Sequence, residues 1–109
     1  MRLKDSQIQG IVKAFEEVSH ARDFSLNICA LYLYGSRTKD NLKGGDIDLL
    51  LRVPSFLLKK AQELRIKFSL AMKRRIGEQK IDLLIIDKDP PQDPFHCIAV
   101  EQAILLKKW

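Results

Sequence analysis

The apolar positions of the chain follow two periods, one typical of helices and one of strands. Over residues 6–20 they recur at spacings of three and four, which places them on one stripe of an amphipathic helix. Ser6 with Gln9 fits a capping box at its start. The apolar stripe consists of Ile8, Ile11, Val12, Phe15 and Val18.

A second helical pattern covers residues 56–76. Ser55 after Pro54 can cap this helix, and Gly77 is a natural residue to end it. Its apolar stripe consists of Leu57, Ala61, Leu64, Phe68, Ala71 and Met72. Its polar side is strongly basic, and a solvated face is the simplest interpretation, with a surface for an acidic partner or RNA as the alternative. The cations are Lys59, Lys60, Arg65, Lys67, Lys73, Arg74 and Arg75.

Three segments have the pattern of strands. Residues 27–34 form a nearly continuous apolar run, as expected for a strand covered on both faces. Residues 46–53 alternate, and residues 79–87 are apolar apart from Asp82. Alternation puts Asp46, Asp48, Leu50 and Arg52 on one face. The other face is wholly apolar and is expected to pack on the helices: Ile47, Leu49, Leu51 and Val53.

The end of the chain is predicted to form a last helix, with Asp93 as its N-cap and Pro94 at its first position. One face of it would hold Phe95, Ile98, Ala99, Gln102 and Leu106. We interpret His96 as a surface or partly buried histidine. Trp109 either frames an interface or frays.

These elements predict an α+β fold with a small mixed β-sheet and helices packed mainly on one face. The chain has 109 residues and 46% hydrophobic residues, which suits one domain over residues 1–109. We expect Cys29 and Cys97, which lie among apolar residues, to be buried free thiols. No apolar run is long enough to cross a bilayer and no signal peptide is apparent, so a cytoplasmic location is expected. The net charge of +5 favours polyanionic partners or a phosphate-bearing substrate.

Candidate chemistry is concentrated after the first strand. The apolar run stops at Gly35 and Ser36, and Asp46 and Asp48 then stand at the head of the next strand. Two carboxylates separated by one strand residue point to the same face, where their repulsion favours a divalent cation. Magnesium takes carboxylate oxygens together with substrate phosphates. If a helix starts at Gly35, its backbone N–H groups would suit those phosphates.

Asp82 adds a third carboxylate. An ionised carboxylate is rarely buried without a partner, so Asp82 is expected near a strand end, facing something positive. If its strand lies beside residues 46–53, Asp82 could join Asp46 and Asp48 around one metal site.

This arrangement resembles the nucleotidyltransferase superfamily, whose fold is shared with the palm of polymerase β, and most closely its minimal nucleotidyltransferase group. The matching elements are Gly35-Ser36, the basic and polar loop from Arg37 to Gly45, Asp46-Ile47-Asp48, and Asp82. The resemblance covers roughly residues 27–86. The chain departs from the family pattern at Thr38, Asp40 and Gly45, where alanine, glycine and serine are usual.

The resemblance implies Mg²⁺-dependent transfer of a nucleoside monophosphate from ATP or another nucleoside triphosphate to an acceptor hydroxyl. It implies Asp46, Asp48 and Asp82 as metal ligands and catalytic residues, and Gly35, Ser36 and Arg37 as nucleotide contacts. Few residues remain beyond the catalytic core, so the acceptor is expected on a partner protein. In this group the partner is often a HEPN toxin, for which the small domain is the antitoxin.

Two other functions stay open on the sequence alone. One is an inactive relative that neutralises a partner by covering it, which the departures in the loop favour. The other is nucleic-acid binding through the basic helix, which ranks last because no aromatic row accompanies the basic residues. The acceptor, the preferred base and any homo-oligomer are left undefined by the sequence.

Overall fold

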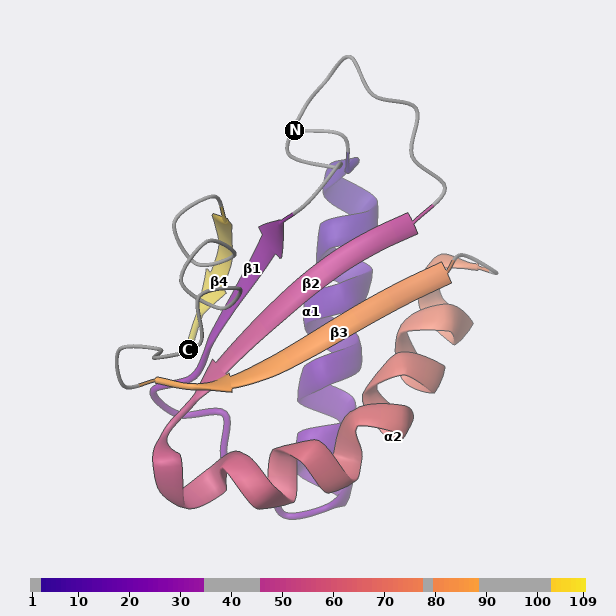
Figure 1. The fold of residues 1–109 in the computed structure, drawn as a ribbon. Coiled ribbons are helices and arrows are strands. Elements are labelled where there is room, and N and C mark those ends of the chain that lie inside the picture. Colours follow the sequence, from indigo (N-terminus) through magenta and orange to yellow (C-terminus); the bar gives the residue numbers. More distant parts are fainter. Residues whose placement is uncertain (1–2, 35–45, 78–79, 89–102) are drawn as a thin grey trace.

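The computed structural model describes residues 3–34, 46–77, 80–88 and 103–109 of the chain, which form two α-helices and four strands within those ranges (Figure 1). In order, the elements are α1 (Asp5–Ala21), β1 (Ala30–Tyr34), β2 (Asp46–Val53), the short 3₁₀ helix η2 (Ser55–Leu57), α2 (Leu58–Ile76), β3 (Lys80–Asp87) and β4 (Ile104–Lys108).

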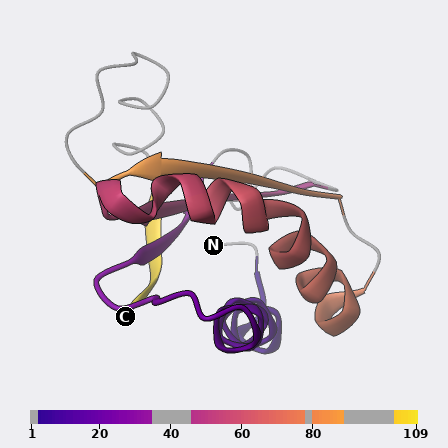
Figure 2. The same cartoon turned by 90° about the horizontal axis from the view of Figure 1, so that it is seen from below.

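The strands form one mixed sheet in the order β3-β2-β1-β4. β2 and β3 are parallel and are joined through α2, whereas β1 is antiparallel to both β2 and β4. Figure 2 shows that α1 and α2 lie on the same side of the sheet. The predicted fold class is therefore confirmed: α+β, with a small mixed sheet and its helices on one face.

The main core lies between the helices and the sheet. The alternate residues of β2 from Ile47 to Val53 face it and are fully buried, as their period of two predicts. The ring of Phe68 in α2 packs at a tilt of 36° against that of Phe15 in α1, with ring centroids 4.7 Å apart. Each fully buried large apolar side chain contributes about 1.5–3 kcal/mol, so this layer supplies most of the driving force for folding.

The two helices approach each other closely at Gly10. A Cβ atom at this position would lie 2.9 Å from Cγ2 of Ile76 in α2. Farther along α1, Glu17 accepts a hydrogen bond from Arg75 at 2.7 Å and lies 3.6 Å from Arg74. Glycine therefore serves helix packing here, although it lowers helix propensity.

The predicted helix starts are wrong in detail. The first helix is capped by Lys4, whose backbone N–H donates to the side-chain oxygen of Gln7 at 3.0 Å, and not by Ser6. Ser55 does not cap α2, which begins at Leu58. Its hydroxyl instead donates to the Asp87 carboxylate, at 2.7 Å to each oxygen, and so joins the ends of β2 and β3. Hydroxyl residues suit both roles, and tertiary contacts decide between them.

The first strand is shorter than predicted. It begins at Ala30, because Ile28 has a φ of +63°, which an extended strand does not accommodate. The backbone N–H of Cys29 donates to Leu26 O at 2.8 Å, which closes a turn before the strand. The apolar run alone could not separate this turn from the strand. Cys29 is a buried free thiol, as predicted, and Cys97 lies outside the described residues.

The predicted last helix is wrong for residues 104–108, which form β4 on the edge beside β1. Leu106 fitted a helical series by spacing, but short apolar runs fit either structure, and pairing with β1 decides this one. Phe95, His96, Ile98, Ala99 and Gln102 lie outside the described residues. Trp109 does not fray: its backbone N–H donates to Cys29 O at 3.1 Å, and its indole N–H donates to Glu16 at 3.0 Å.

Within the described ranges, no helix has both the length and the apolar character that crossing a membrane requires.

Candidate functional site at one end of the sheet

Three strands meet at the end of the sheet that holds the predicted carboxylates. Asp48 of β2 is the register partner of Asp82 in β3 on one side and of Tyr34 in β1 on the other. The C-terminal end of β1 therefore lies beside the N-terminal half of β2, whose other edge pairs with the N-terminal half of β3. Since neighbouring strands are about 4.8 Å apart, residues distant in sequence become direct neighbours here.

These three residues share the face of the sheet that points away from the helices. Ile47, Leu49, Ile81 and Leu83 alternate with the two aspartates and belong to the core on the helical side. Farther along the same outer face lies a smaller apolar cluster. It consists of Leu50 and Ile86 with Tyr32, Tyr34 and Leu84 packed against them. The carboxylates thus lie at the rim of a buried apolar cluster. Asp82 is exposed and Asp48 is half-buried.

The pKa of Tyr34 reports on the electrostatics of this rim. It is raised above its ordinary value of 10.0, first by burial of the phenol and then by the negative charges of Asp48 and Asp82. Both carboxylates therefore act on the same group. A cation bound between them would relieve their mutual repulsion, and oxygen ligands of this kind suit Mg²⁺.

The third predicted ligand, Asp46, begins β2, and its backbone pairs with Lys80 of β3. Its side chain lies outside the described part of the structure. Among the side chains that are described, no group of three or more His, Cys, Asp or Glu residues is placed to hold a metal ion. The described carboxylate pair, Asp48 and Asp82, is thus the part of the predicted site that the fold brings together. Gly35, Ser36 and Arg37 lie outside the described residues, as do Thr38, Asp40 and Gly45.

Two residues near this pair were not singled out from the sequence. Tyr34 directly precedes Gly35 and borders Asp48, and Lys80 stands two residues before Asp82 on the same strand face. Period-two alternation could have found Lys80 as the cation nearest to Asp82 along the strand. The position of Tyr34 required the pairing of β1 with β2, which sequence spacing does not reveal.

A groove runs along the edge of β3 beside this site. Its volume is about 260 Å³, and it lies between α2 and residues 81–83 of β3, with Asp82 among its lining residues. From α2 it is lined by Arg65, Ser69 and Lys73. The groove therefore leaves the Asp82 side chain accessible to a ligand from the α2 side, where the lining carries positive charge.

No protein-family model matches the chain, and no curated protein matches it. Among solved structures, the chain is similar to a crystal structure of a candidate nucleotidyltransferase from Sulfolobus solfataricus, with 23% sequence identity and a TM-score of 0.47. The similarity covers 95% of this chain and 85% of that one. Similarity at this level does not define an activity, so function has to be argued from the residues of this chain.

Proposed function

We propose that the protein is a nucleotidyltransferase that moves a nucleoside monophosphate from ATP, or another nucleoside triphosphate, to an acceptor hydroxyl. The observation that carries this proposal is the placement of Asp48 directly opposite Asp82, beside the end of the strand that leads into Gly35-Ser36. Phosphoryl transfer depends on positioning and charge neutralisation, and a pair of carboxylates on adjacent strands can hold a cation that serves both.

The residues have the following roles in this proposal. Asp46, Asp48 and Asp82 would hold Mg²⁺, which when bound neutralises charge on the phosphates. Gly35 and Ser36 would hold the β and γ phosphates through backbone N–H groups and the Ser36 hydroxyl. Arg37 would add positive charge at the triphosphate.

The reaction forms one bond and breaks one. The acceptor hydroxyl oxygen bonds to the α-phosphorus, the bond from that phosphorus to the bridging oxygen breaks, and pyrophosphate leaves. The hydroxyl proton passes to the carboxylate of Asp82, which the groove along β3 leaves accessible from the α2 side.

We further propose that the acceptor lies on a partner protein. The resemblance to minimal nucleotidyltransferases suggests a HEPN-type toxin, with this chain as the antitoxin that nucleotidylates it. This part of the proposal rests on the sequence resemblance alone.

A catalytically inactive binding module is the second candidate. It is favoured by the departures at Thr38, Asp40 and Gly45, since an aspartate near a triphosphate is electrostatically unfavourable. In that case the fold would neutralise a partner by covering it, and the carboxylate pair would be dispensable.

Transfer of label from [α-³²P]ATP to the product of a neighbouring gene, co-purified with this chain, separates the two candidates. The proposal expects Mg²⁺-dependent labelling of the partner that the double variant Asp48→Asn with Asp82→Asn abolishes. Neutralisation of the partner by that variant, without any labelling by the wild-type chain, would support the binding module and overturn the enzyme.

A further inference from the structure

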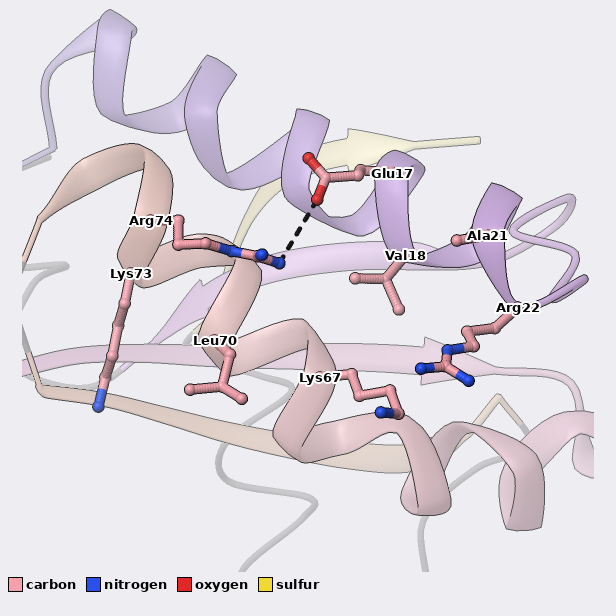
Figure 3. Close-up of a pocket in the computed structure, with 8 residues that line it drawn as sticks. All are labelled: Glu17, Val18, Ala21, Arg22, Lys67, Leu70, Lys73 and Arg74. Atoms are coloured by element: carbon pink, nitrogen blue, oxygen red, sulfur yellow. Dashed lines mark ion pairs between the residues drawn. The ribbon is translucent and has the colours of Figure 1, made fainter.

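A pocket of about 600 Å³ lies between α1 and α2, on the side of the sheet opposite to the carboxylate pair (Figure 3). This volume is in the range of pockets that bind ligands. Val18 and Ala21 of α1 and Leu70 of α2 form its apolar wall. Because the apolar residues of its described lining are aliphatic, this lining offers space for aliphatic side chains and no aromatic ring for stacking.

The charged residues around this pocket are unbalanced. In Figure 3, Arg22 from the end of α1 and Lys67 from α2 extend toward the same space between the helices. Neither has an ion-pair partner among the described residues. Glu17, the one acid among the described residues that line the pocket, already contacts Arg74 and Arg75. Two cations that share a pocket without an acid between them favour a negatively charged ligand.

The apolar wall continues onto the outer surface of α2. Leu70 is 55% exposed, and Ile66, one turn before it, is 69% exposed. Residues four apart on a helix are neighbours, so these two form one aliphatic strip. Large aliphatic side chains exposed beside cations are typical of a surface that another protein covers.

We propose that this α1–α2 pocket and the strip of Ile66 and Leu70 dock an acidic amphipathic helix of a partner protein. Its aliphatic side chains would enter between Val18 and Leu70, and its carboxylates would meet Arg22 and Lys67. This is helix-in-groove recognition, in which anchors spaced at three and four residues fill an apolar groove while charges at the rim select the partner.

Nucleic acid fits the same surface less well. Binding to phosphates alone would leave the aliphatic strip exposed to water, and bases bind single-strand sites by stacking on aromatic side chains. The strip and the pocket wall contain none. An acidic peptide satisfies the cations and covers the aliphatic residues at once, so the protein partner is the better match.

The docking surface also adjoins the groove that Asp82 lines. Leu70 and Lys73 line both the α1–α2 pocket and the groove beside Asp82. A partner held on the strip therefore has its surface next to the candidate catalytic carboxylate. Only this last placement rests on the proposed nucleotidyl transfer, since docking itself requires neither nucleotide nor metal.

The test is a selection of helical peptides from a displayed library with no composition bias, carried out without nucleotide. The wild-type chain is the target, and a Lys67→Glu, Arg22→Glu double variant is the counter-target. Binding of selected peptides is then measured by fluorescence anisotropy. Lys59→Glu with Lys108→Glu is the matched control, because it makes the same change in net charge at exposed residues that line neither hollow.

We expect the selection to enrich peptides with aliphatic residues on one face and Glu or Asp beside them. Their affinity should fall at least tenfold with Lys67→Glu plus Arg22→Glu and with Leu70→Ser, and less than threefold with the control. Enrichment of basic or aromatic peptides, no enrichment, or equal losses in both double variants would overturn the proposal. So would a labelled RNA oligonucleotide that binds more tightly than any peptide and whose binding is lost with Lys67→Glu plus Arg22→Glu. Circular dichroism confirms that each variant is folded.

Discussion

Asp48 and Asp82 occupy directly opposed positions on two parallel strands, so each variant of one changes the electrostatic environment of the other. We predict that Asp48→Asn or Asp82→Asn lowers transfer activity by about 100-fold or more, because several kcal/mol of charge stabilisation at the phosphates are lost. Thermal stability should stay the same or rise, since a repulsive pair is removed.

Labelled-ATP transfer and thermal melting, with and without Mg²⁺, measure these effects. Glu63→Gln, on the solvent-exposed side of α2, is the matched control and should change neither quantity. Full activity in both aspartate variants would contradict the proposed role of the pair.

Tyr34 gives a spectroscopic measure of the same site. Its pKa is raised by burial and by the two aspartates, so neutralising Asp48 or Asp82 should shift its ionisation toward lower pH. Mg²⁺ bound at the pair should shift it in the same direction. Absorbance of phenolate in a Tyr32→Phe background isolates Tyr34, because the chain has two tyrosines. A titration curve that neither the aspartate variants nor Mg²⁺ moves would show that the carboxylates do not act on this phenol.

The raised pKa of Tyr34 also predicts how stability depends on pH. The unfolded chain loses the phenol proton near the ordinary value of 10.0, whereas the folded chain retains it to higher pH. The contribution of Tyr34 is therefore complete below pH 10 and is lost as the pH rises through the folded-state pKa. Tyr34→Phe should reduce the alkaline loss of stability, as urea unfolding at pH 8 and above pH 10 would detect.

The close approach of the helices at Gly10 predicts that substitutions at Gly10 and Ile76 have coupled effects on stability. Alanine usually stabilises a helix relative to glycine by about 1 kcal/mol. Here its Cβ would overlap Cγ2 of Ile76, a β-branched side chain that moves little, so Gly10→Ala should give no gain or a loss. In an Ile76→Leu background, which removes that methyl branch, the same change should stabilise by roughly 0.5–1 kcal/mol. A double-mutant cycle by urea unfolding measures this, and additive effects would rule out the contact.

The contacts of Trp109 predict that its side chain contributes to the stability of the fold. Its indole donates to Glu16, and its ring centroid lies 6.2 Å from that of Phe15. Trp109→Phe should cost about 1 kcal/mol for the hydrogen bond, and Trp109→Ala more, because packing is lost too. Glu16→Gln keeps an acceptor oxygen and serves as the control in thermal melts. Equal stability of the alanine variant would mean that the contact contributes nothing.

Local patterns predicted most of the elements because each has a strong periodic signal. The limits of β2, the apolar face of β2 and the stop at Gly77 all depend on residues within one element, and the structure confirms them. The starts of α1, α2 and β1 were wrong because capping and strand ends depend on contacts with other elements. The strand at residues 104–108 was missed because its pairing partner, β1, is remote in sequence.

The candidate site likewise combines features that local sequence patterns predict with features that depend on contacts between distant elements. The hypothesis that the strand of Asp82 lies beside residues 46–53 is confirmed by the parallel pairing. The roles of Asp46, Asp48 and Asp82, like those of Gly35, Ser36 and Arg37, remain predictions. The neighbourhood of Tyr34 and the α1–α2 pocket depend on tertiary packing, which one-dimensional patterns do not contain.

The strand order of the sheet predicts that the strands carrying Asp48 and Asp82 differ in how readily they open. β2 is hydrogen-bonded on both sides, to β1 and β3, whereas β3 is bonded on one side within the described strands. Amide hydrogens in a doubly paired strand exchange with solvent only through larger openings than those of an edge strand. Asp48 is thus anchored in a doubly paired strand, whose amide hydrogens should exchange more slowly than those of β3. Partial unfolding should release Asp82 first, and bound Mg²⁺ would slow amide exchange chiefly in β3.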